Sequence, residues 1–136
     1  ALQGRGGLLV QRMVAGRREL LAGLTRDPQF GPVVTFGLGG IFAEALADVS
    51  FRICPLSEHD AREMLDEIRA RALLDEVRGL PAVDRDALVR VLLGLARLAH
   101  ERPDVAAVDI NPLVIDGANP VAVDALVVLR APDEGS

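Results

Sequence analysis

Three polar side chains lie in apolar stretches near the end of the sequence. Asp109 and Asn111 precede the run Pro112-Leu113, and Asp124 lies thirteen positions after Asn111 inside a second apolar stretch. An oxygen-bearing side chain in an apolar strand costs free energy unless it has a partner, and a divalent cation is one such partner. These residues are therefore candidate ligands of a metal ion.

The residues between Asn111 and Asp124 predict how the three polar side chains are brought together. The cluster Asp116-Gly117-Ala118-Asn119-Pro120 is typical of a turn, so 109–115 and 120–129 are expected to form a β-hairpin. If residues 116–119 form the loop, Ile115 pairs with Pro120 and Asn111 lies opposite Asp124. A two-residue loop at 116–117 instead places Asp109 opposite Asp124. Asp109 and Asn111 share one face of a strand, so either loop gathers all three polar groups, whereas an odd loop would separate them.

A structural role for the same residues is an equal alternative from the residues alone. In that interpretation Asn111 caps a turn at Pro112 and Asp124 accepts a hydrogen bond from a backbone amide. An Asn before proline favours the extended conformation that such a turn uses.

The elements that position these residues follow from local patterns. Apolar segments at 19–25, 32–36 and 48–53 predict strands, with a turn at 26–31. Ser57 and Asp60 have the spacing of a helix N-cap, and a second helix is expected from Asp84 to Pro103. Residues 71–80 between the helices are ambiguous, with a helical turn around 73–77 as one option. Each helix has one apolar stripe, so we predict an α+β two-layer sandwich with a mostly antiparallel sheet and two main helices on one face.

Two further segments have residues suited to binding an anion. Gly37-Leu38-Gly39-Gly40 follows a predicted strand, and closely spaced glycines let backbone amides turn towards a phosphate. A plain tight turn is the alternative. Arg26 follows another strand and has the rigid donor set of a phosphate ligand, although a surface pair with Asp27 explains it equally well.

Composition excludes several classes of function. A net charge of -5 without a basic run argues against binding nucleic acid. No apolar stretch has the length of a membrane span and no leader opens the chain, so we expect a cytoplasmic protein without a membrane partner. All fifteen basic residues are Arg, which excludes lysine chemistry within this sequence. Cys54 is expected to be a buried structural thiol, and neither His59 nor His100 has a partner at metal-ligand or triad spacing.

The same segments, in order along the chain, resemble the ATP-grasp portion of the nucleoside-diphosphate-forming acyl-CoA synthetases. This family includes ADP-forming acetyl-CoA synthetase and the β subunit of succinyl-CoA synthetase. The matching stretches are 9–14, 18–20, 25–34, 36–44, Asp109 to Leu113 and Val123 to Ala125.

The resemblance implies an ATP-grasp second lobe, which in this family shares Mg²⁺ and ATP or ADP with a first lobe. The metal ligands would be Asn111 and Asp124, with Asp109 acting indirectly or through water. Gly37, Gly39 and Gly40 would line the nucleotide phosphates, with Arg26 stabilising charge beside them.

The resemblance also implies a fragment that is not active alone. The family reaction converts acyl-CoA, ADP and phosphate to acid, CoA and ATP, reversibly, and needs a first ATP-grasp lobe and CoA-binding domains as partners in the same parent protein. We expect residues 8–129 to form the single lobe, with flexible ends at 1–7 and 130–136. The alternative is a ligand-sensing lobe, without turnover, in a protein or small-molecule acyltransferase.

Overall fold

The computed structural model describes residues 18–40 and 47–131. Within them lie the strands β1 (Glu19–Asp27), β2 (Gly31–Leu38), β3 (Val49–Ile53), β4 (Val105–Asp116), β5 (Asn119–Ala122) and β6 (Ala125–Leu129). The helices are α2 (Glu58–Glu67), the 3₁₀ helix η1 (Arg69–Leu74) and α3 (Arg85–Glu101). The matching stretch 9–14, the expected loose end 1–7 and residues 132–136 of the expected tail 130–136 lie outside the described residues.

One antiparallel sheet forms a layer of the molecule. Its order is β3-β2-β1-β4-β5, and β6 pairs with β4 beside β5. All paired strands are antiparallel. The predicted strands at 19–25, 32–36 and 48–53 are confirmed, each within two residues at either end.

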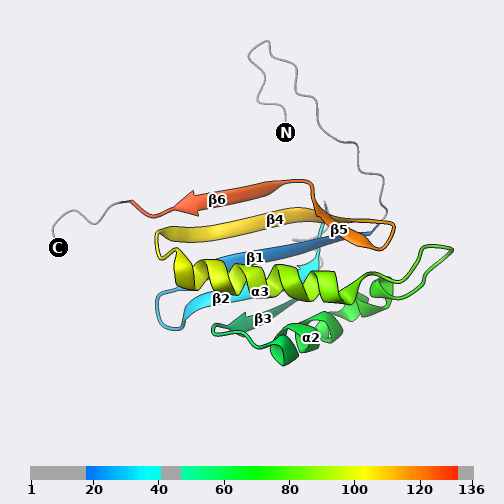
Figure 1. Ribbon diagram of the computed structural model, residues 1–136, viewed down its shortest axis with the longest axis horizontal. Helices are drawn as coiled ribbons and strands as arrows, with labels where there is room; N and C mark the ends of the chain where they lie inside the picture. The colour runs from blue at the N-terminus through cyan, green and yellow to red at the C-terminus, as the bar shows by residue number, and fades with distance from the viewer. Residues whose placement is uncertain (1–17, 41–46, 132–136) are drawn as a thin grey trace, which may run out of the picture.

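The helices form the second layer, on one face of the sheet (Figure 1). Ser57 and Asp60 make the expected capping box at the start of α2, and the Asp84 side chain caps α3 by accepting from the amide of Ala87. The ambiguous segment forms η1, which lies earlier than the suggested turn at 73–77. The predicted α+β two-layer architecture is therefore confirmed.

The core lies between the two layers. Alternate residues of β1 and β2 point into it and are fully buried, as are the apolar stripes of both helices: Leu20, Ala22, Leu24, Val34, Phe36, Met64 and Leu92. Intervening residues point to the other face of the sheet. Among the described residues no helix covers that face, and none is long and apolar enough to cross a membrane.

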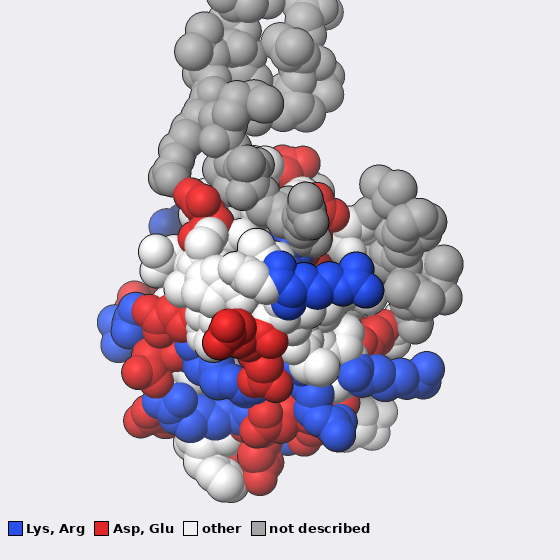
Figure 2. Space-filling model, turned by 90° about the vertical axis from the view of Figure 1, so that its right-hand side faces the viewer, with Lys and Arg blue, Asp and Glu red and all other residues white. Residues whose placement is uncertain are grey.

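The surface at one end of the molecule shows acidic and basic side chains interspersed (Figure 2). Several are paired across elements, as Arg62 is with Glu58 and Asp86, and Arg85 with Asp66 and Asp75. Exposed pairs of this kind contribute little each, because water screens them.

Candidate functional site

The hairpin that contains the predicted metal ligands has the expected register. Ile115 pairs with Pro120, and Asp116 pairs with Asn119. The expected four-residue loop is a two-residue turn in the structure, because β4 and β5 extend through Asp116 and Asn119. Gly117 adopts φ +64°, a left-handed conformation that suits glycine. The alternative register, with Asp109 opposite Asp124, is absent.

Asn111 and Asp124 lie directly opposite each other. The N–H of Asn111 donates to the carbonyl oxygen of Asp124 at 3.1 Å, and the N–H of Val123 donates to the carbonyl oxygen of Pro112 at 3.3 Å. Directly paired residues point to the same face of a sheet. By alternation this is the face opposite the helices, so both side chains are directed away from the core.

A β-bulge in β4 sets the position of Asn111 relative to β1. Leu20 pairs with Leu113 and Ala22 with Ile110, so Asn111 and Pro112 together face the single residue Leu21. Proline has no N–H for the ladder, and a bulge is a place where a sheet accepts it. The bulge keeps Ile110 and Leu113 on the helix face and Asn111 on the open face.

The glycine segment ends beside this hairpin. The N–H of Gly40 donates to Oδ1 of Asn111 at 3.2 Å, and the N–H of Gly39 donates to the carbonyl oxygen of Glu19 at 2.9 Å. Gly40 adopts φ +86°, and a Cβ atom there would collide with Oε2 of Glu19. The start of β1, the segment that follows β2 and the bulge of β4 therefore bring Glu19, Gly40 and Asn111 together.

The other two predicted glycines pack against backbone. A Cβ atom on Gly37 would collide with the carbonyl oxygen of Asp48, and one on Gly39 would collide with that of Leu20. These contacts explain the glycines without a ligand and favour the tight-turn interpretation for both positions.

Arg18 and Glu19 are site residues that the sequence reasoning missed. Arg18 is 4% exposed. It donates to the carbonyl oxygen of Gly117 at 2.6 Å and to that of Leu73 at 3.2 Å. Its own carbonyl oxygen accepts from the N–H of Ile115. Arg18 therefore fastens the hairpin turn to η1. The alternation of side chains along β1 could have indicated the position of Glu19. Leu20 faces the core, so the preceding residue Glu19 points to the open face.

Arg26 is not brought to this end of the sheet. It lies near the opposite end of β1, where it donates to the carbonyl oxygens of Val105 at 2.7 Å, Ala99 at 2.9 Å and Arg102 at 3.1 Å. Two of these carbonyls belong to the C-terminal end of α3. Cationic side chains satisfy helix ends in this way, so the structure assigns Arg26 a capping role and not a place beside the other candidates.

The donor set at Asn111 and Asp124 fits a magnesium ion. An amide oxygen and a carboxylate are hard oxygen ligands, and Mg²⁺ usually takes one or two protein ligands beside water and nucleotide phosphates. Oδ1 of Asn111 has a second lone pair beyond its bond with Gly40. Over residues 18–40 and 47–131, no cluster of three or more His, Cys, Asp or Glu is placed to hold a metal. Phosphate oxygens would thus have to complete the coordination.

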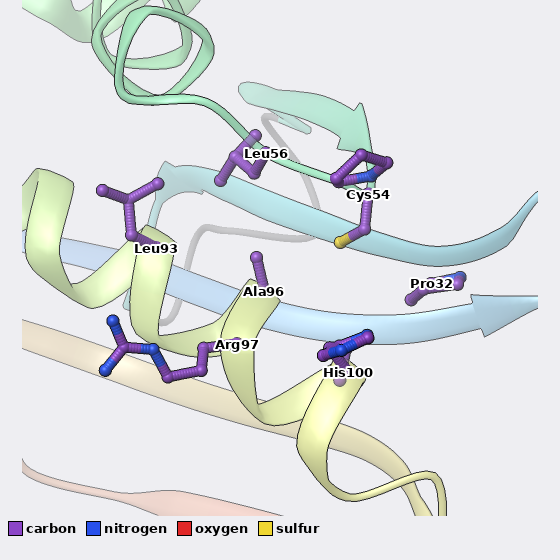
Figure 3. Close-up of a pocket in the computed structure, with 9 residues that line it drawn as sticks. Pro32, Cys54, Leu56, Leu93, Ala96, Arg97 and His100 are labelled. Carbon is purple, nitrogen blue, oxygen red and sulfur yellow. The ribbon is translucent and has the colours of Figure 1, made fainter.

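Away from Asn111 and Asp124, a hollow lies between α3 and the segment that joins β3 to α2 (Figure 3). Its volume is about 740 Å³, and Cys54, Leu56, Leu93 and Ala96 are among its lining residues. Cys54 is half-buried, and its burial raises the pKa of the thiol. The thiol is thus a neutral group in the wall of the hollow, half-buried where the sequence predicted a buried one. None of the predicted site residues lines this hollow.

The fold and the sequence match one class of protein. A family model described as an ATP-grasp domain matches residues 3–129. This covers most of the chain, which therefore belongs to the ATP-grasp domain family.

Within the ATP-grasp family, the chain is similar to ADP-forming acetate–CoA ligases. The chain is 45% identical over 123 residues to the acetate–CoA ligase (ADP-forming) I subunit β of Pyrococcus furiosus, covering 90% of this chain and 53% of that protein. It is 43% identical to acetate–CoA ligase (ADP-forming) I of Archaeoglobus fulgidus, covering 90% of this chain and 18% of that protein. The chain thus spans about half the length, or less, of these relatives.

A solved structure shows the same relationship. Acetyl-coenzyme A synthetase 1 of Ca. Korarchaeum cryptofilum, in complex with coenzyme A and Mg-AMPPCP, superposes with a TM-score of 0.79 at 46% identity. The match covers 83% of this chain and 53% of that chain. The apo form of the same synthetase gives a TM-score of 0.82 at 44% identity, covering 88% of this chain and 57% of that chain. The predicted resemblance to the ADP-forming synthetases is confirmed.

Proposed function

We propose that this chain is the magnesium-nucleotide lobe of an ADP-forming acyl-CoA synthetase. The observation that carries the proposal is the direct pairing of Asn111 with Asp124 on the open face of the sheet. It supports the proposal because a metal bridging two residues needs both side chains on one face and within reach of one ion. The sequence similarity to synthetases supports the class of reaction.

In this proposal the amide oxygen of Asn111 and the carboxylate of Asp124 would hold the Mg²⁺ ion that accompanies ADP or ATP. A bound Mg²⁺ neutralises charge on the transferring phosphoryl group. Asp109 is exposed on the same face and would act indirectly, through water bound to the ion. The bond from Gly40 fixes the rotamer of Asn111, and Arg18 holds the hairpin turn in place.

The rest of the reaction belongs to polypeptide outside this sequence. Relatives about twice the length or longer have room for a first ATP-grasp lobe and for CoA-binding domains. We propose that the parent protein supplies these partners, that it works in the cytoplasm, and that the chain alone does not turn over. Acyl-CoA, ADP and phosphate would be its substrates.

Calorimetric titration of the parent synthetase with Mg-ADP tests the proposal. Asn111→Ala and Asp124→Asn should each weaken binding at least about tenfold, because each removes a ligand or a charge from the metal. Asp66→Asn is the matched control, since Asp66 is an exposed carboxylate on α2 in the helix layer. Unchanged affinity in both site variants would contradict the proposal. Titrations with ADP in EDTA should show little difference among the variants.

A further inference from the structure

Strand β6 is an apolar strand that no other element covers within residues 18–40 and 47–131. All five of its residues are exposed, and its four large side chains are between 43% and 62% exposed: Leu126, Val127, Val128 and Leu129. It has no charged residue along its length. An exposed apolar edge strand is a ready partner for another strand.

The helix layer stops short of this strand. Val127 pairs with Val108 of β4 and so points to the helix side. Val108 is 6% exposed beneath the helices, whereas Val127 is 52% exposed. On its outer side β6 has no paired strand within the described part of the chain, and Figure 1 shows it at the margin of the sheet.

The opposite edge of the sheet is protected in a way that β6 is not. Arg52 is the fourth of the five residues of β3 and forms ion pairs with Glu63, at 3.2 Å, and with Glu67. A charged side chain on an edge strand is a common device against strand pairing. Strand β3 also exposes Phe51 and Ile53, at 56% and 50%, but it carries this charged side chain, whereas β6 carries none.

We propose that β6 pairs antiparallel with β6 of a second copy of this chain, about a two-fold axis at Val127. Such an axis is perpendicular to the sheet, so the helix faces of both copies lie on the same side. Directly paired residues point to the same face, and side chains alternate along a strand, so the numbers of two paired residues must add up to an even sum. Centring on Val127 makes that sum 254. Leu126 then faces the partner's Val128, and Ala125 faces the partner's Leu129.

Charge complementarity selects this register over its neighbours. With the axis at Val127, Asp124 lies opposite the partner's Arg130, and both fall on the open face by alternation. An axis at Val128 would place Leu126 opposite the partner's Arg130. An axis at Leu126 would place Asp124 opposite the partner's Val128. Only the first register matches apolar residues with apolar residues and closes each end with an opposite charge.

The pairing has a consequence for the candidate site. It brings the partner's Arg130 beside Asp124, one of the two proposed metal ligands. The two sheets become one continuous sheet with the α3 helices of both copies on the same side. Isologous pairing of this kind closes the assembly at a dimer, because each copy has one such edge.

Sedimentation velocity of the full 136-residue chain over a range of concentrations tests the proposal. A reversible monomer–dimer equilibrium is expected. Val127→Lys should raise the dimer dissociation constant at least about tenfold, since two like charges meet at the axis. Phe51→Lys is the matched control, because Phe51 is 56% exposed on the opposite edge strand. It should leave the equilibrium unchanged.

A charge exchange tests the register. Arg130→Asp and Asp124→Arg should each weaken the dimer several-fold, because each sets like charges opposite each other. The double variant should restore it. Circular dichroism checks that every variant is folded, and the hydrogen bond from Arg130 to the carbonyl oxygen of Asp104 comes from the backbone N–H, which the Arg130 substitution keeps.

Three results would overturn the proposal. The first is a chain that stays monomeric at all concentrations. The second is a dimer that survives Val127→Lys as well as it survives Phe51→Lys. The third is hydrogen-exchange protection, in a monomeric parent synthetase, of those β6 amides that point away from β4, which would show that another part of the parent covers this edge.

Discussion

The backbone N–H of Asn111 donates to the carbonyl oxygen of Asp124 at 3.1 Å, so two residues thirteen positions apart are direct neighbours across a hairpin. The pairing depends on whether the number of residues in the connecting loop is even or odd. Side chains alternate along a strand, and a shift of one residue would have sent Asp124 to the face under the helices. The two-residue turn at Gly117 and Ala118 preserves the even count that keeps both side chains on the open face.

Gly40→Ala should destabilise the fold more than Gly31→Ala does. Both glycines have positive φ, +86° and +79°, so both substitutions incur backbone strain of about 1 kcal/mol. A Cβ atom on Gly31 meets nothing within 4 Å, whereas one on Gly40 displaces the carboxylate of Glu19. Urea unfolding of the two variants measures the difference. Equal losses of stability would show that Glu19 does not pack against Gly40 in solution.

Arg26→Met should lower the free energy of unfolding by about 2 kcal/mol, because three carbonyl oxygens lose a charged donor. Arg97→Met is the matched control on the exposed side of α3, with an expected change below about 0.5 kcal/mol. In the folded parent synthetase, Mg-ADP affinity should be the same for both variants. A selective loss of nucleotide affinity in Arg26→Met would restore the phosphate role that the sequence allowed.

Stability should fall as the solution is acidified below about pH 4. The hydrogen bond from Arg52 lowers the pKa of Glu67, and hydrogen bonds from Ser57 lower the pKa of Asp60. Each carboxyl thus binds its proton less readily in the folded chain than in the unfolded chain. The stability they add is complete above the unfolded pKa and is lost as pH falls through the folded pKa.

Urea midpoints at neutral and acid pH measure this dependence. Arg52→Met should flatten the acid limb, because it removes the partner that lowers the pKa of Glu67. A wild-type midpoint that does not change on acidification would contradict the assignment.

The isolated chain should bind Mg-ADP far more weakly than the parent synthetase, by about a hundredfold or more, because an incomplete cleft buries little of a ligand's surface. Calorimetry on the two proteins under the same buffer measures the ratio. Comparable affinities would show that this lobe holds the nucleotide without a first lobe.

The local elements were predictable because their signals are local. Ser57 and Asp60 are three positions apart and cap the same turn, so the capping box needs no information from elsewhere in the fold. The turn chemistry left two hairpin registers open, with either Asn111 or Asp109 opposite Asp124. The alternation of side chains placed all three residues on one face in both registers.

The contacts around that pair depended on the tertiary structure. Gly40 meets Asn111 across 71 positions of sequence, and Arg26 meets Ala99 across 73. Both depend on how separate strands and helices pack, which no nearby residues encode. By itself the sequence determined the elements, the hairpin parity and the family. The tertiary structure decided that Glu19 and Gly40 lie beside Asn111, that Arg26 caps a helix, and that none of the described elements covers β6. Long-range packing selects among contacts that local patterns leave equally open.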